Sequence, residues 1–127
     1  MSFTPERLTR FCREEAGDTL RAVFTYRRDD GRLLYARDDV RSSLTSAAIE
    51  QYQEAAWEVH GVISDQIGRV EGMGPHRVSV HTFDFGFAFQ FVHSDERGVL
   101  ATFDGEVGRN LHEFIMRCEE KLGIEQV

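Results

Sequence analysis

Phenylalanine occupies every second position from Phe83 to Phe91, and this spacing constrains the fold more than any other feature of the chain. Successive side chains of a β-strand point to opposite faces, so a period of two predicts strand structure. Within this run Asp84-Phe85-Gly86 favours a turn, because Asp bonds to neighbouring backbone groups and Gly tolerates positive φ. We therefore predict a hairpin with strands over about residues 77–83 and 87–94, followed by a third strand over about residues 99–103.

The second strand of this hairpin is largely apolar on both of its faces. Phe87, Phe89 and Phe91 share one face, and the residues at 88, 90 and 92 share the other. This pattern is typical of an interior strand with packing on both sides. Because Phe is often buried, the ladder is interpreted first as core. The alternative is an aromatic-lined ligand cup between the sheet and a helix, formed by Phe87, Phe89 and Phe91.

Composition indicates a single globular domain over residues 1–127, since 41% of the residues are hydrophobic and 29% are charged. No apolar run is long enough to span a membrane, and the N-terminal sequence has no signal-peptide core, so we expect a cytoplasmic protein without membrane contact. The net charge of −7 argues against nucleic acid as a partner, because phosphate contacts need Lys and Arg.

The basic residues are unusually uniform, because fourteen of the fifteen are Arg and only Lys121 is Lys. An acidic surface that is poor in Lys is typical of halophilic archaea, in which surface charge keeps proteins soluble in strong salt. A genome of high GC content is the alternative explanation, since it also favours Arg codons.

The N-terminal part predicts a short helix and then a hairpin. Thr4-Pro5-Glu6 is a favourable helix start, and Gly17 is a favourable end. Alternation over residues 18–26 and 33–37 predicts two strands around Asp30-Gly31, with Leu20 and Phe24 on the same face. Several Arg residues around this hairpin are largely neutralised by neighbouring Asp residues, so we interpret them as a solvated surface.

The longest predicted helix covers about residues 44–70. Its apolar stripe, which we expect to face the core, contains Ala48, Tyr52, Ala55, Ala56, Val59, Ile63, Ile67 and Val70. Trp57 projects about 140° away from Tyr52 at 100° per residue, and Ile49 and His60 lie near it on the helix surface. Because Trp is enriched at binding hot spots, this side is a candidate interface. The alternative is that Trp57 packs under a neighbouring loop.

A final helix is predicted over about residues 111–122, since Leu111, Phe114, Ile115 and Cys118 follow helical spacing. The whole order is then αββαβββα. It predicts an α+β fold in which a five-stranded antiparallel sheet carries helices on both faces.

This order of elements resembles that of the roadblock and profilin-like folds over nearly the whole chain. The roadblock resemblance implies homodimerisation through the long helix and the edge strand that follows it, here residues 44–70 and 77–83. It also implies a role as a scaffold or regulator of small GTPases and motors. On this basis the predicted interface consists of Trp57, Ile49, His60, Val78 and Val80.

A second resemblance lies in the first hairpin, TYRRDDGRLLYARDDVR. Its Tyr, Asp-Asp, Leu-Tyr and Arg-Asp-Asp-Val elements are similar to those of small haloarchaeal proteins of unknown function. The shared residues are Tyr26, Asp29, Asp30, Leu34, Tyr35, Arg37, Asp38, Asp39 and Val40. This resemblance brings no assigned activity and therefore no functional residues.

The sequence lacks the usual motifs of catalysis, metal binding and nucleotide binding. The five His residues show no tight ligand spacing, and no Cys-x-x-Cys or glycine-rich phosphate loop occurs. His76, His81 and His93 could approach one another on neighbouring strands, and Asp84 and Asp104 could pair as acid and base, but surface and turn positions explain them more simply. We expect no catalytic residues, no cofactor and no bound metal.

The resulting hypothesis is a non-enzymatic, cytoplasmic interaction or regulatory domain that acts as a homodimer or with a partner protein. The alternative is a PAS-like or profilin-like sensor that binds a small molecule in the aromatic-lined cup.

Overall fold

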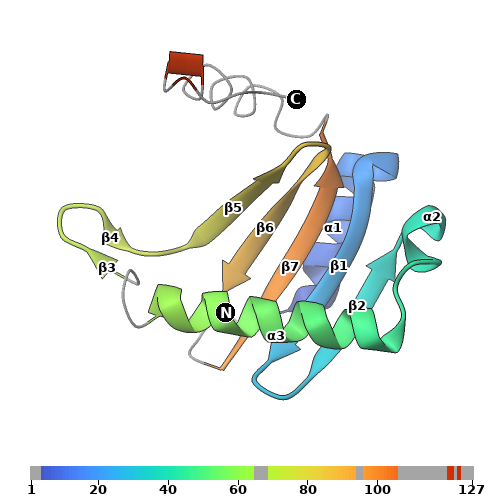
Figure 1. The fold of residues 1–127 in the computed structure, drawn as a ribbon, viewed down its shortest axis with the longest axis horizontal. Coiled ribbons are helices and arrows are strands. Elements are labelled where there is room, and N and C mark those ends of the chain that lie inside the picture. The colour runs from blue at the N-terminus through green and yellow to red at the C-terminus, as the bar shows by residue number, and fades with distance from the viewer. Residues whose placement is uncertain (1–3, 65–68, 94–95, 106–119, 122, 124–127) are drawn as a thin grey trace.

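The computed structural model describes residues 4–64, 69–93, 96–105, 120–121 and 123 (Figure 1). The helix predicted over residues 111–122, including Cys118, lies almost entirely outside this part of the chain. The chain begins with α1 (Pro5–Ala16), which has Pro at its start and is followed by Gly17 at a φ of 55°. A short 3-10 turn, η1 (Gly17–Thr19), then leads into the sheet. The predicted start and end of this helix are therefore confirmed.

The described strands form a five-stranded antiparallel sheet with the order β2-β1-β7-β6-β5. Its strands are β1 (Leu20–Arg27), β2 (Gly31–Ala36), β5 (Val78–Phe83), β6 (Gly86–Val92) and β7 (Arg97–Asp104). The middle strand is β7, while β2 and β5 lie at the two edges. This architecture confirms the predicted fold class, and β6 is an interior strand as expected.

The turn inside the phenylalanine ladder is also confirmed. Phe83 pairs with Gly86, so only Asp84 and Phe85 connect β5 to β6. A Cβ atom on Gly86 would clash with the backbone oxygen of Phe103 on β7, which explains the absence of a side chain at this position.

Helices cover both faces of the sheet, as predicted, with α1 behind it and α3 (Ser46–Val62) in front (Figure 1). The α1 face contains the larger core cluster, and Phe89 and Phe91 pack against it. Its buried residues are Cys12, Leu20, Val23, Val99, Ala101 and Phe103. On the α3 face, Phe24, Tyr26 and Ala56 form a smaller cluster.

The predicted faces of β1 are wrong at its start. Leu20 belongs to the α1 cluster, whereas Phe24 belongs to the α3 cluster. The pairing of β1 with β7 shifts register between Leu20 and Ala22. An irregularity of this kind interrupts the strict alternation of side chains. The sequence pattern alone did not reveal it.

The predicted long helix is wrong in its length. Regular α-helix ends at Val62, and Val70 lies in a separate short strand. That strand, β3 (Arg69–Val70), pairs with β4 (Gly74–Pro75) in a two-stranded sheet of its own. A second short helix, α2 (Asp38–Arg41), precedes α3.

The predicted core stripe of α3 is wrong in part. Ala56 and Ile63 are buried as predicted, but Tyr52 is 53% exposed and Val59 is 37% exposed. The other buried residues of the helix are the polar Gln53 and His60. The physical reason is polar: Gln53 Nε2 donates to the backbone oxygens of Arg27 and Arg28, at 2.6 and 2.5 Å. These carbonyls lie at the turn of the β1–β2 hairpin, and Gln53 supplies them with a hydrogen-bond donor.

Arg37, which follows β2, joins four parts of the structure. Its guanidinium makes two hydrogen bonds to the carboxylate of Asp39, at 2.6 and 3.0 Å, and two to that of Asp104, at 2.6 and 3.3 Å. A fifth bond of 2.6 Å reaches the backbone oxygen of Asp18. Arg21 also donates to Asp104 at 3.3 Å. Hydrogen bonds from Arg37 hold the pKa values of Asp39 and Asp104 below their usual range.

We expect Arg37→Lys to lower the free energy of unfolding at pH 7, because an ammonium group cannot reproduce two bidentate pairs. A carboxyl with a lowered folded pKa stabilises the fold above its unfolded pKa, and this contribution is lost as pH falls through the folded value. The difference between wild type and variant should therefore shrink in acid. Urea unfolding at several pH values measures it.

Arg32→Lys is the matched control, because Arg32 is exposed and forms one ion pair of 3.7 Å with Glu6. It should leave stability unchanged. Equal effects of the two substitutions would show that Arg37 has no special structural role.

Candidate functional site

Three of the five predicted interface residues lie on the packing side of α3. His60 is only 1% exposed, so its assignment to the surface is wrong. Trp57 is half-buried and stacks on His60, with ring centres 5.0 Å apart and an angle of 16° between the planes. The Arg28 guanidinium lies 5.8 Å from the centre of the Trp57 ring. Ile49 packs with Trp57 against the α3 cluster.

The two predicted interface residues on β5 are exposed at the edge of the sheet. Val78 is 41% exposed and Val80 is 38% exposed. They pair with Phe91 and Phe89 of β6, so they lie on the α1 face of an edge strand. The structure therefore separates the predicted interface residues into a packed group on α3 and an exposed group on β5.

A chain of hydrogen bonds runs through the core between β5 and α3. His81 Nε2 lies 2.9 Å from Gln90 Oε1, and Gln90 Nε2 donates to the Tyr26 hydroxyl at 2.9 Å. Gln90 Nε2 also donates to the backbone oxygen of Ala56 at 3.1 Å. The Tyr26 hydroxyl in turn lies 2.7 Å from Nδ1 of His60. We call His81, Gln90, Tyr26 and His60 the polar chain.

The direction of each bond in the polar chain follows from the available hydrogens. Both amide hydrogens of Gln90 are used, so its oxygen accepts from His81. The Tyr26 hydroxyl accepts from Gln90 and therefore gives its only hydrogen to Nδ1 of His60. Because Gln90, Tyr26 and His60 are each 1% exposed, water cannot replace a missing partner easily.

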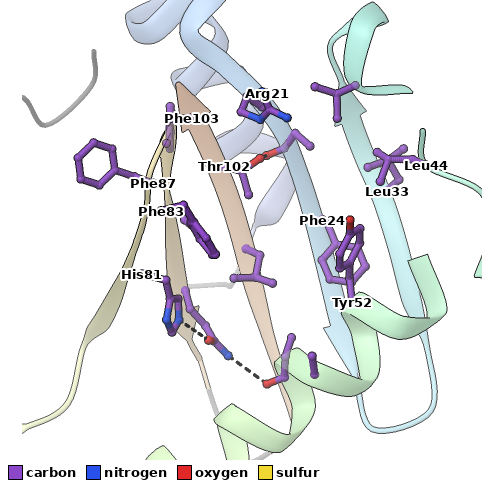
Figure 2. Close-up of a pocket in the computed structure, with 18 of the residues that line it drawn as sticks. Arg21, Phe24, Leu33, Leu44, Tyr52, His81, Phe83, Phe87, Thr102 and Phe103 are labelled. Carbon is purple, nitrogen blue, oxygen red and sulfur yellow. Dashed lines mark hydrogen bonds between the residues drawn. The ribbon is translucent and has the colours of Figure 1, made fainter. Parts of the chain in front are cut away.

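An open cavity of about 780 Å³ lies on the α3 face of the sheet (Figure 2). Its walls are mostly apolar and come from α3, from the central strands and from the β5–β6 hairpin. They include Phe24, Leu33, Leu44, Ile49, Tyr52, Ala55, Val59, Phe83, Phe85, Ala88 and Leu100. His81 and Gln90 of the polar chain also line it. We call this cavity the α3 groove.

The α3 groove is not the cup predicted from the phenylalanine ladder. Phe87 contributes to its wall, but Phe89 and Phe91 pack against the α1 cluster on the opposite face of the sheet. The alternation of β6 was read correctly, since Ala88 and Gln90 share the α3 face. The prediction placed the cup on the face of β6 opposite to that of the α3 groove.

Two exposed rows of side chains run along α3 beside its buried face. One row is apolar and contains Tyr52, Ala55, Val59 and Val62, with Val62 49% exposed. The other row is acidic and contains Glu50, Glu54 and Glu58, all of them exposed. Spacings of three and four residues place the members of each row on one side of the helix. The apolar row borders the α3 groove through Tyr52, Ala55 and Val59.

Three of the titratable residues considered for chemistry, Asp104, His76 and His81, have structural partners. Asp104 binds Arg37 and Arg21 and therefore does not form an acid–base pair with Asp84. His76 lies 2.8 Å from the Ser79 hydroxyl, and His81 belongs to the polar chain. Across the described ranges, no cluster of three or more His, Cys, Asp or Glu residues is placed to hold a metal ion. None of the helices described is long and apolar enough to cross a membrane.

Tyr26 and Gln53 were missed as functional candidates, and Gln90 was noted only for its face. A signal was present for Gln90, because a polar residue interrupts an apolar strand at a position that must be buried. Gln53 and His60 carried no comparable local signal, since polar residues are common on exposed helix faces.

We expect Tyr26→Phe to lower the free energy of unfolding by about 1–3 kcal/mol at pH 7, because it removes the buried hydroxyl that bonds to His60 Nδ1 and to Gln90 Nε2. Burial raises the pKa of Tyr26 to about 12. The pKa of Tyr in an unfolded chain is about 10. The stabilisation by the neutral phenol is therefore complete below that pH, and it is lost as the pH rises towards the pKa of Tyr26 in the folded protein. Denaturant unfolding between neutral and alkaline pH should show this loss in wild type only.

Tyr52→Phe is the control, since Tyr52 is exposed and its hydroxyl makes no hydrogen bond in the described part of the chain. It should match wild type at every pH. A Tyr26→Phe variant as stable as wild type would contradict the assigned bonding.

Comparisons with known proteins agree with this architecture. A search of curated proteins gave no match. Among solved structures, the fold is similar to that of MglB from Myxococcus xanthus, with a TM-score of 0.53 and 12% sequence identity over 96% of this chain and 91% of that one. At this identity the likeness concerns the fold, which is roadblock-like. Residues 6–123 match the family described as "Domain of unknown function (DUF7522)". The chain therefore belongs to the DUF7522 family and has a roadblock-like fold.

Proposed function

We propose that this protein is a non-enzymatic interaction domain that forms a homodimer through the edge strand β5, with α3 alongside. A roadblock-like fold supports a small regulatory or interaction domain. The observation that carries the proposal is the exposed apolar edge: Val78 and Val80 of β5 are 41% and 38% exposed, and among the described strands β5 has a neighbour on one side only.

An edge strand presents a row of backbone donors and acceptors that can pair with a second chain. If two copies pair antiparallel along β5, the same residues meet across a two-fold axis and both free edges are used. The side chains of Val78 and Val80 would then extend the apolar surface that Phe89 and Phe91 begin on the α1 face. The apolar row of α3 offers further area for the same or another contact.

The predicted role of Trp57 in this interface changes with the structure. Trp57 is half-buried between His60 and Arg28, so it supports the position of α3 on the sheet. We therefore assign the helix contribution to Tyr52, Val59 and Val62, whose side chains are exposed.

The chemistry of the described residues is consistent with a binding role. Cys12, which is buried in the α1 cluster, has a raised pKa because of burial, and this disfavours the reactive thiolate. His60 and His81 already serve the polar chain. These partners support structural roles for the groups that would otherwise be candidates for catalysis.

We expect Val80→Lys to convert a dimer into a monomer, because a charged side chain on an edge strand opposes strand pairing between copies. Size exclusion with light scattering measures the mass at low and high potassium chloride. Thermal unfolding should remain cooperative, since Val80 is an exposed residue.

Val70→Lys provides the same chemical change at a valine that is 46% exposed on β3. It should leave the mass of the dimer unchanged. A wild-type protein that is monomeric in both salts would overturn the proposed homodimer, and equal dissociation by both variants would remove β5 as the specific site.

A further inference from the structure

The β5 edge of the sheet carries opposite charges at its two ends. The strand itself, Val78–Phe83, contains no Lys, Arg, Asp or Glu. Arg77 stands immediately before the strand and Asp84 immediately after it, and both residues are exposed. Within the described residues neither of them has an ion-pair partner. One cation and one anion at the ends of this edge are therefore available to a second chain.

The symmetry of a dimer restricts how two β5 strands can meet. When two identical edge strands pair antiparallel, the two-fold axis is perpendicular to the sheet, and residues opposite each other project from the same face. Val78 and Val80 project from the α1 face, whereas His81 and Phe83 line the α3 groove on the other face. The registers with the fullest overlap therefore place either Val80 opposite Val80 or His81 opposite His81.

In both registers Arg77 lies beside the β5–β6 turn of the second copy. The first register places Arg77 opposite Phe83 of that copy, and the second places it opposite Phe85, with Asp84 between these two positions. Adjacent strands are about 4.8 Å apart and one residue advances about 3.4 Å along a strand, so a long Arg side chain can reach the diagonal neighbour. The two-fold axis produces the same contact at the other end of the interface.

The same two charges oppose a parallel arrangement of the strands. Parallel pairing would place Arg77 beside Arg77 and Asp84 beside Asp84. Like charges on neighbouring strands are destabilising, whereas opposite charges attract and exclude wrong arrangements. The uncharged centre of β5 has no such preference, since its valines offer apolar contact in either direction. The direction of pairing is thus determined at the ends of the strand.

We propose that Arg77 of each copy forms an ion pair with Asp84 of the other copy, and that these two symmetric pairs determine the direction and register of β5–β5 pairing. This inference rests on the homodimer proposed above and deepens it, because it names the residues by which one copy recognises the other. Val78 and Val80 supply apolar contact, and the charged ends align it.

Charge reversal tests the ion pairs through the symmetry of the dimer. A homodimer of Arg77→Asp would bring two carboxylates together at each end, and a homodimer of Asp84→Arg would bring two guanidinium groups together. Each variant should have a dissociation constant at least about tenfold higher than that of wild type. An equimolar mixture restores opposite charges at both ends of the heterodimer, so its dissociation constant should return to within about threefold of wild type. Sedimentation velocity over a dilution series near physiological salt measures all four samples.

The matched controls make the same changes in charge away from the edge. Arg10→Asp and Glu15→Arg alter exposed residues of α1. Alone or mixed, they should change the dissociation constant by less than about twofold. If the controls weakened the dimer as much as the edge variants, the ion pairs would be overturned, because the response would be to net charge.

A second pair of variants keeps the test independent of the turn. Asp favours a turn conformation, so Asp84→Arg also changes the hairpin, whereas Asp84→Asn keeps a turn-forming side chain and removes the charge. Arg77→Gln removes the opposite charge. Each should raise the dissociation constant by about twofold to tenfold, and the double variant should do no more than either alone, because the ion pair is already lost. Additive effects of the two substitutions would contradict a direct contact.

The outcomes separate this inference from the homodimer itself. A monomeric wild type would overturn both. A wild-type dimer that Val80→Lys dissociates, but that Arg77→Asp leaves intact, would overturn the ion pairs alone. Charge-reversed variants that unfold cooperatively on heating and still fail to associate when mixed would do the same.

Discussion

The hydrogen bond between Tyr26 and His60 lies where the sheet meets α3, and the orientation of the helix depends on it. The bond spans 34 residues of sequence and is buried, so neither partner can exchange it for water without cost. Gln90 links the same tyrosine to the backbone of Ala56, and Gln53 holds the next turn of the helix to the β1–β2 hairpin. Rotating α3 to bury its apolar row would break all of these bonds together.

This constraint explains why α3 leaves its more apolar row exposed to solvent. Dispersion and burial favour Tyr52 and Val59 in the core, but the buried face also has to satisfy the carbonyls of Arg27 and Arg28 and the hydroxyl of Tyr26. The groove and the exposed row are thus consequences of polar bonding in the core. The side chains that the proposed dimer uses on α3 are ones that this arrangement leaves accessible.

Local rules were sufficient for the sheet and insufficient for the packing of α3. The period of two, the Asp84-Phe85 turn and the Asp30-Gly31 turn depend on residues close in sequence, and they predicted the hairpins and the fold class. The face of α3 depends on Gln53 and His60 reaching β1, which precedes them by 26 and 34 residues. Hydropathy assigns polar residues to the outside unless their distant partners are known. The interface prediction therefore named His60, whereas the exposed side is that of Tyr52 and Val59.

The two edges of the sheet differ in a way that limits assembly. The β2 edge begins after the charged turn at Arg28, Asp29 and Asp30, and it ends at Arg37, which is held by Asp39 and Asp104. Charges at both ends and Arg32 within the strand discourage pairing there, whereas β5, which is equally long, contains no Lys, Arg, Asp or Glu. If two copies paired through β5, each would use the more favourable of the two edges of its described sheet. Growth would then stop at two chains, and the sheet would be protected from polymerising into fibres.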